Sequence, residues 1–331
     1  MKKLICVILS LVMILMLTAC ASSDEGKTPT GCITYSVAIV QQLDHSSLDE
    51  IRTAIEAQLK ALGEKSEIPV VFNITYENGQ NDASMLNQIG TQVVSDGVDM
   101  IIPIATLAAQ SMVTAADGTD IPVVYAAISD PEGAGLTDIP TVTGVSDALN
   151  TGFIMNMMFA ADPAIQTVGL LYSNSEINSE APIRDAKAYL DAKGIAYVEK
   201  TGNTANEVIA AASDLVGRVD AVFTPTDNAI MAAEAAVAEI LNEAGIPHYT
   251  GADSFVLSGA FTTCGVNYTE LGTKTADIAF DILMGGQIGD FHVMDGGIIT
   301  VNTETAEMCG MDYSVFKDMA NTVNEVTTAA E

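Results

Sequence analysis

The sequence predicts an α/β protein made of two similar lobes, each built on a doubly wound parallel sheet. Short β-rich runs alternate with longer segments that place Ala, Leu, Ile and Met on one helical face. This alternation is typical of parallel sheets with helices on both faces. The two halves of the chain also repeat each other, since residues 37–63 align with 168–194, 98–109 with 219–230, and 121–130 with 246–254.

The elements expected in the first half come in the order strand, helix, strand. The strands are expected at 33–40, 68–76, 98–104 and 121–128, and the helices at 47–62, 83–95 and 106–117. Gly63, which follows the first helix, aligns with Gly194 in the second half, and glycine is common where a helix ends. The boundary between the halves is expected near 145–149, after "PTVTGVSD".

The second half repeats this order and then continues. Its strands are expected at 167–173, 195–200, 219–225 and 246–252, and its helices at 149–160, 180–193, 205–215 and 228–244. A further helix is expected at 269–284, but the repeat does not assign the last 70 or so residues to either lobe.

The residues that follow each strand are the candidates for a binding site. In open parallel sheets, ligands bind beyond the carboxyl ends of the strands, and two lobes that face each other bring these ends into one cleft. The candidates are Gln41 to His45, Thr106 to Ala108, Ser129 and Asp130, Ser173 to Ser179, Thr226 to Asn228, and Asp253 and Ser254.

Opposite charges are expected to bind on the two sides of this cleft. Thr106 begins a helix pattern, and the free N–H groups of a first turn suit a carboxylate, although Thr106 can also be a plain cap. Asp227 aligns with Thr106 in the repeat, and Asp253 follows the next strand. With no Lys or Arg nearby, these acids suit an ammonium group, but Asp227 too can be a cap alone. A zwitterion would therefore bridge the lobes.

The N-terminus has the pattern of an export signal. Lys2 and Lys3 precede the apolar run Leu4 to Leu17, which is too short for a membrane span. "LTAC" resembles a bacterial lipobox, which implies cleavage before Cys20 and a lipid on its thiol; the alternative is an ordinary signal peptide with a chance cysteine. The small polar residues after Cys20 favour a flexible tether.

Composition argues against several functions. The net charge of −30 and the absence of a basic patch argue against nucleic acid as a partner, and leave lipid as the expected attachment to a membrane. The five cysteines form no CxxC pair, so no metal site is expected, and a disulfide among Cys32, Cys264 and Cys309 is left open. No GxSxG, HExxH, P-loop or GxGxxG motif is present, and we expect neither an enzyme nor a cofactor.

Several short motifs together resemble one family. They are "VAIVQQLDHSSLD", "IATLAAQSM", "ISDPEGAGL", "VTGVSD", "LLYSNSEINS", "VDAVFTPTDN" and "GVNYTELGTKTADIAFDIL". In order and spacing they are similar to the substrate-binding lipoproteins of ABC transporters, a family with tryptophan-, tyrosine- and phenylalanine-binding members. The resemblance covers about Thr34 to Met311, and departs from the common pattern at Leu107, where a proline often stands.

The resemblance implies a type I periplasmic-binding-protein fold with three hinge crossings between the lobes. These crossings are expected near 146–147, 254–257 and 290–292. The implied division is a signal peptide at 1–19, a lipidated tether at 20–31, a first lobe at 32–146 plus 258–290, and a second lobe at 147–257 plus 291–331.

The resemblance also assigns roles in the cleft. It places the ligand's α-carboxylate at Thr106 and the N–H of Ala108, and its α-ammonium at Asp227 with Asp253 close by. The other residues expected at the ligand are Asn178, Ser179, Ser129, Tyr268, Gln41 and Gln42. We therefore expect an extracytoplasmic, lipid-anchored, monomeric receptor that delivers an aromatic amino acid to an ABC permease. The alternatives are a ligand sensor of the same fold and a receptor for another solute, such as a sugar or nucleoside.

Overall fold

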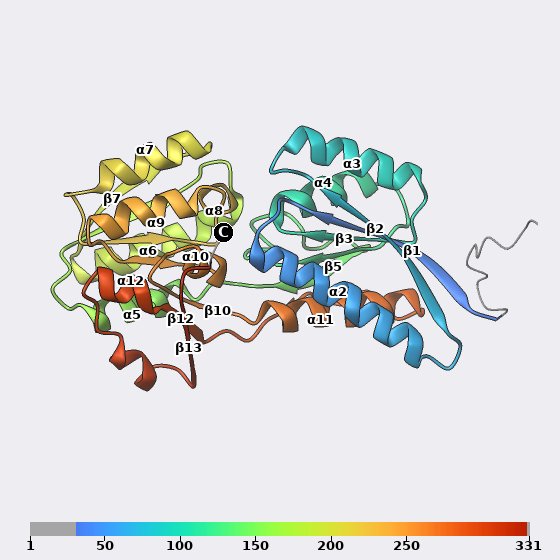
Figure 1. The fold of residues 1–331 in the computed structure, drawn as a ribbon. Coiled ribbons are helices and arrows are strands. Elements are labelled where there is room, and N and C mark those ends of the chain that lie inside the picture. Colours follow the sequence, from blue (N-terminus) through green and yellow to red (C-terminus); the bar gives the residue numbers. More distant parts are fainter. Residues whose placement is uncertain (1–30, 330–331) are drawn as a thin grey trace, which may run out of the picture.

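In a computed structural model, the structure describes residues 31–329 (Figure 1). The expected signal peptide, the lipidation site Cys20 and residues 20–30 of the tether lie outside the described residues. Among the helices between residues 31 and 329, none has the length and apolar composition needed to cross a membrane.

The first lobe is built on a parallel sheet of six strands in the order β11-β5-β4-β3-β1-β2. Helices α3 and α4 cover one face, and α2 and α11 cover the other (Figure 1). Its elements are β1 (Ile33–Gln41), α2 (Ser46–Lys65), β2 (Val70–Asn78), α3 (Ala83–Ser95), β3 (Met100–Ile104), α4 (Thr106–Ala116), β4 (Val123–Ala126), β5 (Val142–Ser146), α11 (Tyr268–Leu283) and β11 (His292–Val293).

The second lobe is built on a sheet of seven strands in the order β13-β12-β10-β9-β8-β6-β7, in which only the β10–β12 pair is antiparallel. Its elements are α5 (Thr151–Ala161), β6 (Thr167–Tyr172), η1 (Ile177–Ser179), α6 (Glu180–Lys193), β7 (Ala196–Thr201), α7 (Ala205–Leu215), β8 (Ala221–Thr224), α8 (Asn228–Met231), α9 (Glu234–Glu243), β9 (His248–Thr250), α10 (Asp253–Leu257), β10 (Thr262–Gly265), β12 (Ile298–Asn302), α12 (Thr303–Met308), η2 (Ser314–Asp318) and β13 (Thr322–Val326).

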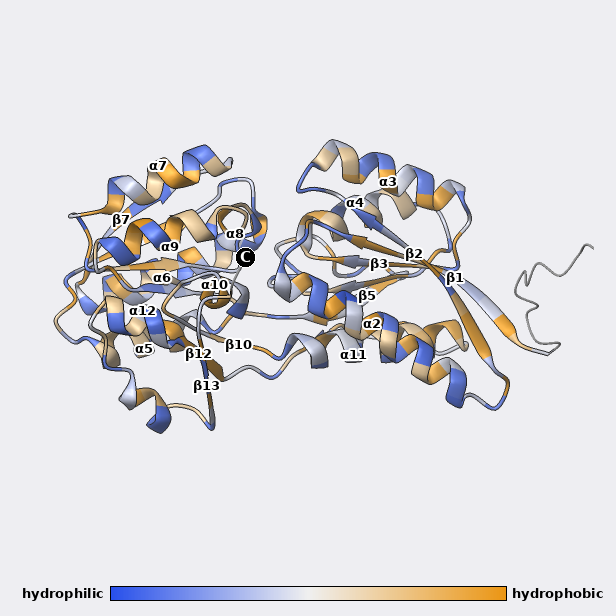
Figure 2. Cartoon of the chain, in the orientation of Figure 1, coloured by the Kyte–Doolittle hydropathy of each residue, from blue (hydrophilic) through white to orange (hydrophobic). Residues whose placement is uncertain are grey.

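Apolar side chains on both faces of each sheet hold the helices in place. The central strands are hydrophobic along their length, whereas the helices have one hydrophobic and one hydrophilic face (Figure 2). In the second lobe, Leu171 and Val222 pack toward α7 and α9, while Val168 and Phe223 pack toward α5 and α6. The predicted α/β class with two doubly wound lobes is confirmed.

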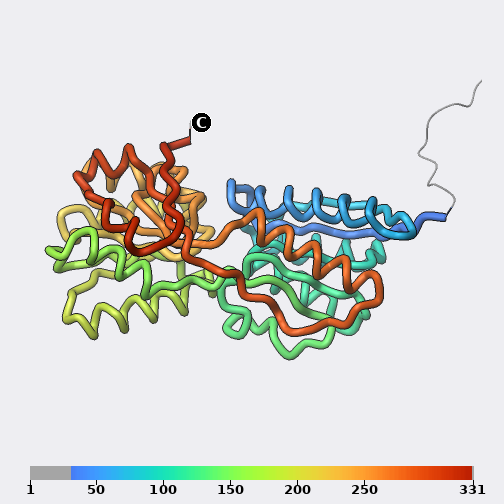
Figure 3. The backbone as a smooth tube through the Cα atoms, turned by 90° about the horizontal axis from the view of Figure 1, so that it is seen from below, coloured from blue at the N-terminus to red at the C-terminus, as the bar shows by residue number. Residues whose placement is uncertain are grey.

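The chain crosses between the lobes three times (Figure 3). It leaves the first sheet after β5, returns between β10 and α11, and leaves again between β11 and β12. These positions correct the predicted lobe boundaries at 258 and 291. The strand β10 pairs with β9 and β12, so residues 262–265 belong to the second lobe, and β11 pairs with β5, so residues 292–293 belong to the first.

Candidate functional site

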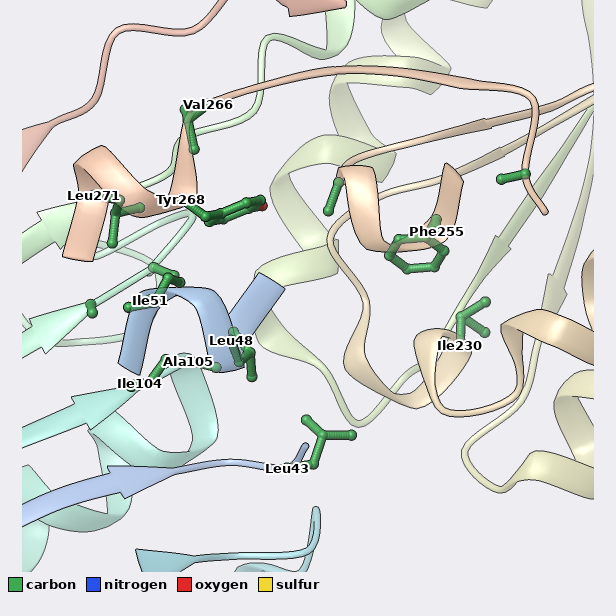
Figure 4. Close-up of a cluster of buried hydrophobic side chains, with 14 of the residues drawn as sticks. Leu43, Leu48, Ile51, Ile104, Ala105, Ile230, Phe255, Val266, Tyr268 and Leu271 are labelled. Atoms are coloured by element: carbon green, nitrogen blue, oxygen red, sulfur yellow. The ribbon is translucent and has the colours of Figure 1, made fainter. Parts of the chain in front are cut away.

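A small cavity lies between the carboxyl ends of the two sheets. Both lobes line it, and so does the first crossing. Leu48 from α2, Phe255 from α10 and Tyr268 from α11 surround the space between the lobes (Figure 4). The lining residues are His45, Ser47, Leu48, Ala105, Thr106, Ala127, Ser129, Asp147, Asn178, Thr226, Asp227, Asn228, Met231, Ala252, Ser254, Phe255 and Tyr268.

Two strained alanines shape the first-lobe side of the cavity. Ala105 follows β3 with φ 73°, and Ala127 follows β4 with φ 56°. A residue with a Cβ rarely adopts this conformation, and such residues gather at functional sites. Ala105, and not Thr106, is the N-cap residue of α4, so the expectation that Thr106 caps this helix is wrong.

The helix start at α4 has two N–H groups without a recorded acceptor in the described chain. Its one recorded partner is Gln42, whose Oε1 accepts a hydrogen bond from the N–H of Leu107 at 2.9 Å. Within residues 31–329, the N–H groups of Thr106 and Ala108 have no acceptor. Two free donors at the positive end of a helix suit a carboxylate.

The carboxylate of Asp227 lies in the cavity wall, but its two oxygens already accept several hydrogen bonds from the protein. Its Oδ1 accepts from the N–H of Ile230 at 3.0 Å and so caps α8, and its Oδ2 accepts from the N–H of Ser173 and from Ser179 Oγ, both at 2.7 Å. Its side chain is fully buried, and burial raises the pKa of Asp227. Asp227 thus fixes the loop after β8 as well as lining the cavity.

Glu176 is a second buried acid beside Asp227. Its Oε1 accepts from Gln42 Nε2 and its Oε2 from Asn228 Nδ2, both at 2.9 Å. Burial, and next the charge of Asp227, raise the pKa of Glu176 to about 7. Glu176 and Asp227 are therefore two neighbouring buried carboxyls. In the described part of the chain, neither forms an ion pair with a basic side chain.

Asp147 is a third buried acid, at the first crossing. It lines the cavity, and its Oδ1 accepts from Ser129 Oγ at 3.0 Å. Burial raises the pKa of Asp147 to about 6, and hydrogen bonding from Ser129 and Tyr268 opposes this shift. Among residues 31–329, Asp147 has no Lys or Arg partner either.

The rest of the cavity lining is mostly apolar, with a few polar atoms. Leu48, Met231 and Phe255 supply large apolar side chains. Ser254 Oγ and His45 Nδ1 are buried and have no hydrogen-bond partner in the described chain. Burial lowers the pKa of His45 to about 4, so its ring is neutral near pH 7. An apolar pocket with a few unpaired polar atoms is the usual form of a small-molecule site.

Half of the ten predicted site residues line the cavity. They are Thr106, Ser129, Asn178, Asp227 and Tyr268. The other five lie outside its lining: Ala108 is buried in α4, Ser179 supports Asp227, Gln42 contacts Leu107 and Glu176, Gln41 donates to Leu43 O at 2.7 Å, and Asp253 accepts from Ser47 Oγ at 2.9 Å.

The sequence analysis missed two of the buried acids. Glu176 lies within the candidate stretch from Ser173 to Ser179, yet no periodicity distinguishes it from the exposed residues around it. Asp147 lies in the predicted boundary between the lobes, which the repeat treats as a connection. The signal that could have found both is their position just past a strand, next to the predicted cleft.

The two lobes contact each other directly across the cleft. Besides the Gln42–Glu176 and Ser47–Asp253 hydrogen bonds, the hydroxyls of Ser129 and Thr226 lie 2.9 Å apart. His45 Nε2 lies 3.4 Å from Asn228 Oδ1. The structure is therefore a closed arrangement of the lobes.

Known proteins are similar to this chain in both sequence and fold. Residues 36–317 match the model of a family described as ABC transporter substrate binding protein. The chain is 32% identical to the tyrosine-binding protein of Clostridioides difficile (strain R20291), over 94% of this chain and 93% of that protein.

Two solved structures are similar over most of this chain. One is an ABC domain in complex with L-Trp from Streptococcus pneumonia, with TM-score 0.80 and 28% identity over 88% of this chain and 99% of that one. The other is a ligand-free, open structure of a substrate binding protein with adhesive properties from Clostridium difficile, with TM-score 0.66 and 31% identity over 89% and 100%. The overall shape is thus closer to the ligand-bound structure.

Proposed function

The chain belongs to the family of ABC transporter substrate-binding proteins, and we propose that it binds an aromatic amino acid in the cavity between its lobes. One observation carries this proposal: the same cavity joins a helix start with free N–H groups to buried acids that have no basic partner in the described chain. A zwitterion satisfies both, with its carboxylate at Thr106 and Ala108 and its ammonium group at the acids.

The aromatic character of the ligand is supported by the cavity lining and by the relatives. Leu48, Met231 and Phe255 offer apolar contact to a ring. Phe255 can pack against that ring edge to face or with an offset. One relative bears the name of a tyrosine-binding protein, and one similar structure holds L-Trp. We therefore place tyrosine and tryptophan first among the candidate ligands.

Binding would favour the closed arrangement, because the groups that contact the ligand come from both lobes. A ligand shifts a conformational equilibrium only by its difference in affinity for the two states. With the lobes apart, one end of the zwitterion loses its partner. Closure would then be a hinge motion about the three crossings.

Anchoring and delivery complete the proposal. Proteins of this family are extracytoplasmic, and we propose that Cys20 carries a lipid that holds this monomeric chain at the outer side of the cell membrane through its tether. The closed, loaded form would deliver its ligand to an ABC permease. This part of the proposal rests on the lipobox-like "LTAC" and on the family.

A thermal-shift screen tests the ligand class. The chain from Ala21 to Glu331 is unfolded and refolded to remove bound ligand, then melted with each of the twenty amino acids, several sugars and several nucleosides. A ligand at ~100 times its Kd adds about 2.7 kcal/mol to stability, which raises the melting temperature clearly. We expect a rise with tyrosine or tryptophan. A rise with a sugar or nucleoside alone would contradict the proposal.

A further inference from the structure

Asp147 lies at the first crossing between the lobes and lines two hollows there. It follows β5, where the chain first crosses between the lobes, and it lines the ligand cavity. It also lines a second hollow, where the first crossing meets the segments Gly265 to Tyr268 and Gly296 to Gly297 of the other two. No other acid of the cavity is shared with that hollow. A charge bound by Asp147 would therefore lie beside all three crossings.

The carboxylate of Asp147 has no basic partner in the part of the chain that the structure describes. The residue is only 6% exposed, and its carboxylate takes hydrogen bonds from Ser129 and Tyr268 but forms no ion pair with Lys or Arg in the described chain. Burying a carboxylate without a cation is costly, and the group then tends to take up a proton. The raised pKa of Asp147 agrees with this expectation.

The two acids that the sequence analysis assigned to the ammonium group, Asp227 and Asp253, are less suited to it than Asp147. A carboxylate has about four lone-pair sites, and Asp227 already uses three for Ile230, Ser173 and Ser179. Asp253 accepts from Ser47 and lines a different hollow from the ligand cavity. Two acids line the cavity, Asp147 and Asp227, and Asp227 has the larger number of hydrogen bonds from protein donors.

We propose that Asp147 is the residue that binds the α-ammonium group of the ligand, and that Asp227 is a positioning residue which fixes the loop after β8. This inference rests on the proposed function. Ser129 connects Asp147 to closure, because its hydroxyl donates to Asp147 and lies 2.9 Å from the hydroxyl of Thr226 in the other lobe. Ser254 Oγ in the same cavity has no hydrogen-bond partner among residues 31–329, which is a further sign that a ligand completes the site.

Calorimetric titration with two probes tests the proposal. The probes are L-tyrosine and 3-(4-hydroxyphenyl)propionate, which keeps the ring and carboxylate of tyrosine but has hydrogen in place of the ammonium group. The proteins are the refolded wild type, Asp147→Asn and, as the matched comparison, Asp227→Asn. The measured quantity is the preference, the ratio of the two dissociation constants.

The wild type should prefer tyrosine by about 10- to 100-fold, the range expected for a hydrogen bond to a charged group. Asp147→Asn should reduce this preference to within a few fold, while Asp227→Asn should keep it even where overall affinity falls. Thermal melts of both variants check folding. Ser129→Ala, which removes the hydroxyl that orients Asp147, should reduce the preference partly and serves as the test if Asp147→Asn does not fold.

The outcomes separate this inference from the proposed function. If Asp147→Asn keeps the wild-type preference for tyrosine, or if only Asp227→Asn removes it, the inference is wrong. The proposed function would remain in place. Equal wild-type affinity for the two probes overturns the role of any acid in binding the ammonium group. A wild type that binds neither tyrosine, tryptophan nor phenylalanine overturns the proposed function, and the inference with it.

Discussion

Glu176 is a buried acid with no basic partner in the described chain, and this should make the stability of the protein depend on pH. It is buried beside Asp227, and Gln42, Asn178 and Asn228 are the polar side chains that face it. Burial and the charge of Asp227 raise its pKa from an ordinary value of 4.5 to about 7. The folded state therefore holds this proton more tightly than the unfolded chain does.

We expect the ligand-free protein to lose stability as the pH rises from about 4.5 to 7. In this window the folded state keeps the proton of Glu176 and the unfolded chain has released it, so the free energy of unfolding falls with increasing pH. Asp147 adds the same effect between 3.8 and about 6. Urea unfolding of the refolded, ligand-free protein at several pH values measures the trend.

Glu176→Gln separates this residue from the many other acids of the chain. The amide does not titrate, so the variant should lose less stability than the wild type between about pH 4.5 and 7. The same pH dependence in both proteins would show that Glu176 does not hold its proton in the folded state.

Sequence patterns predicted most elements of both lobes but not all of their ends. Alternation and the internal repeat located β1 to β4 and β6 to β9 with the helices between them. The expected helix at 228–244 is instead two helices, α8 and α9, separated at Ala232 and Ala233. The strands β5, β10, β12 and β13 were missed because β5 lies in the predicted boundary between the halves and the other three lie in the last 70 or so residues, which the repeat does not cover.

The site was predictable only where it depends on a strand end. Thr106, Ser129 and Asp227 each follow a strand, and each lines the cavity. Contacts between distant residues, such as that between Gln42 and Glu176, depend on how the two lobes close on each other. The sequence patterns of each lobe do not predict this arrangement. For the same reason, the sequence could not show that Asp227 would already be occupied by Ser173 and Ser179.

The helix α4 depends on a side chain from another element, which makes Gln42 a target for mutation. Gln42 is buried after β1, and it accepts from Leu107 of α4 while donating to Asn81 and Glu176. Gln42→Ala would leave these buried groups without partners in the closed state, at a cost of about 1–3 kcal/mol. Calorimetry with L-tyrosine should then show binding weakened about 10- to 100-fold.

Gln110→Ala is the control for this effect. Gln110 lies on the same helix, but it donates to Ala134 O at 3.0 Å and does not line the cavity. Its loss should leave tyrosine affinity within about twofold of the wild type. If Gln42→Ala binds as tightly as Gln110→Ala, the contact from Gln42 to α4 and to the second lobe has no part in binding.

At the scale of the whole molecule, the binding site exists only when the lobes are together. The donors at α4 belong to the first lobe, Asp227 and Phe255 belong to the second, and Asp147 lies on the first crossing. The hydrogen bonds that join the lobes are few, and they lie around the cavity. A ligand that fills the cavity would add contacts to both lobes at once, so binding and closure are one process.

The most direct test of this account is a crystal structure of the refolded protein grown with L-tyrosine. The account predicts tyrosine in the cavity between the lobes, with its carboxylate at the N–H groups of Thr106 and Ala108, its ammonium group at Asp147 and its ring against Leu48 and Phe255. Tyrosine bound elsewhere, or in the cavity with its carboxylate turned toward the acids, would contradict it.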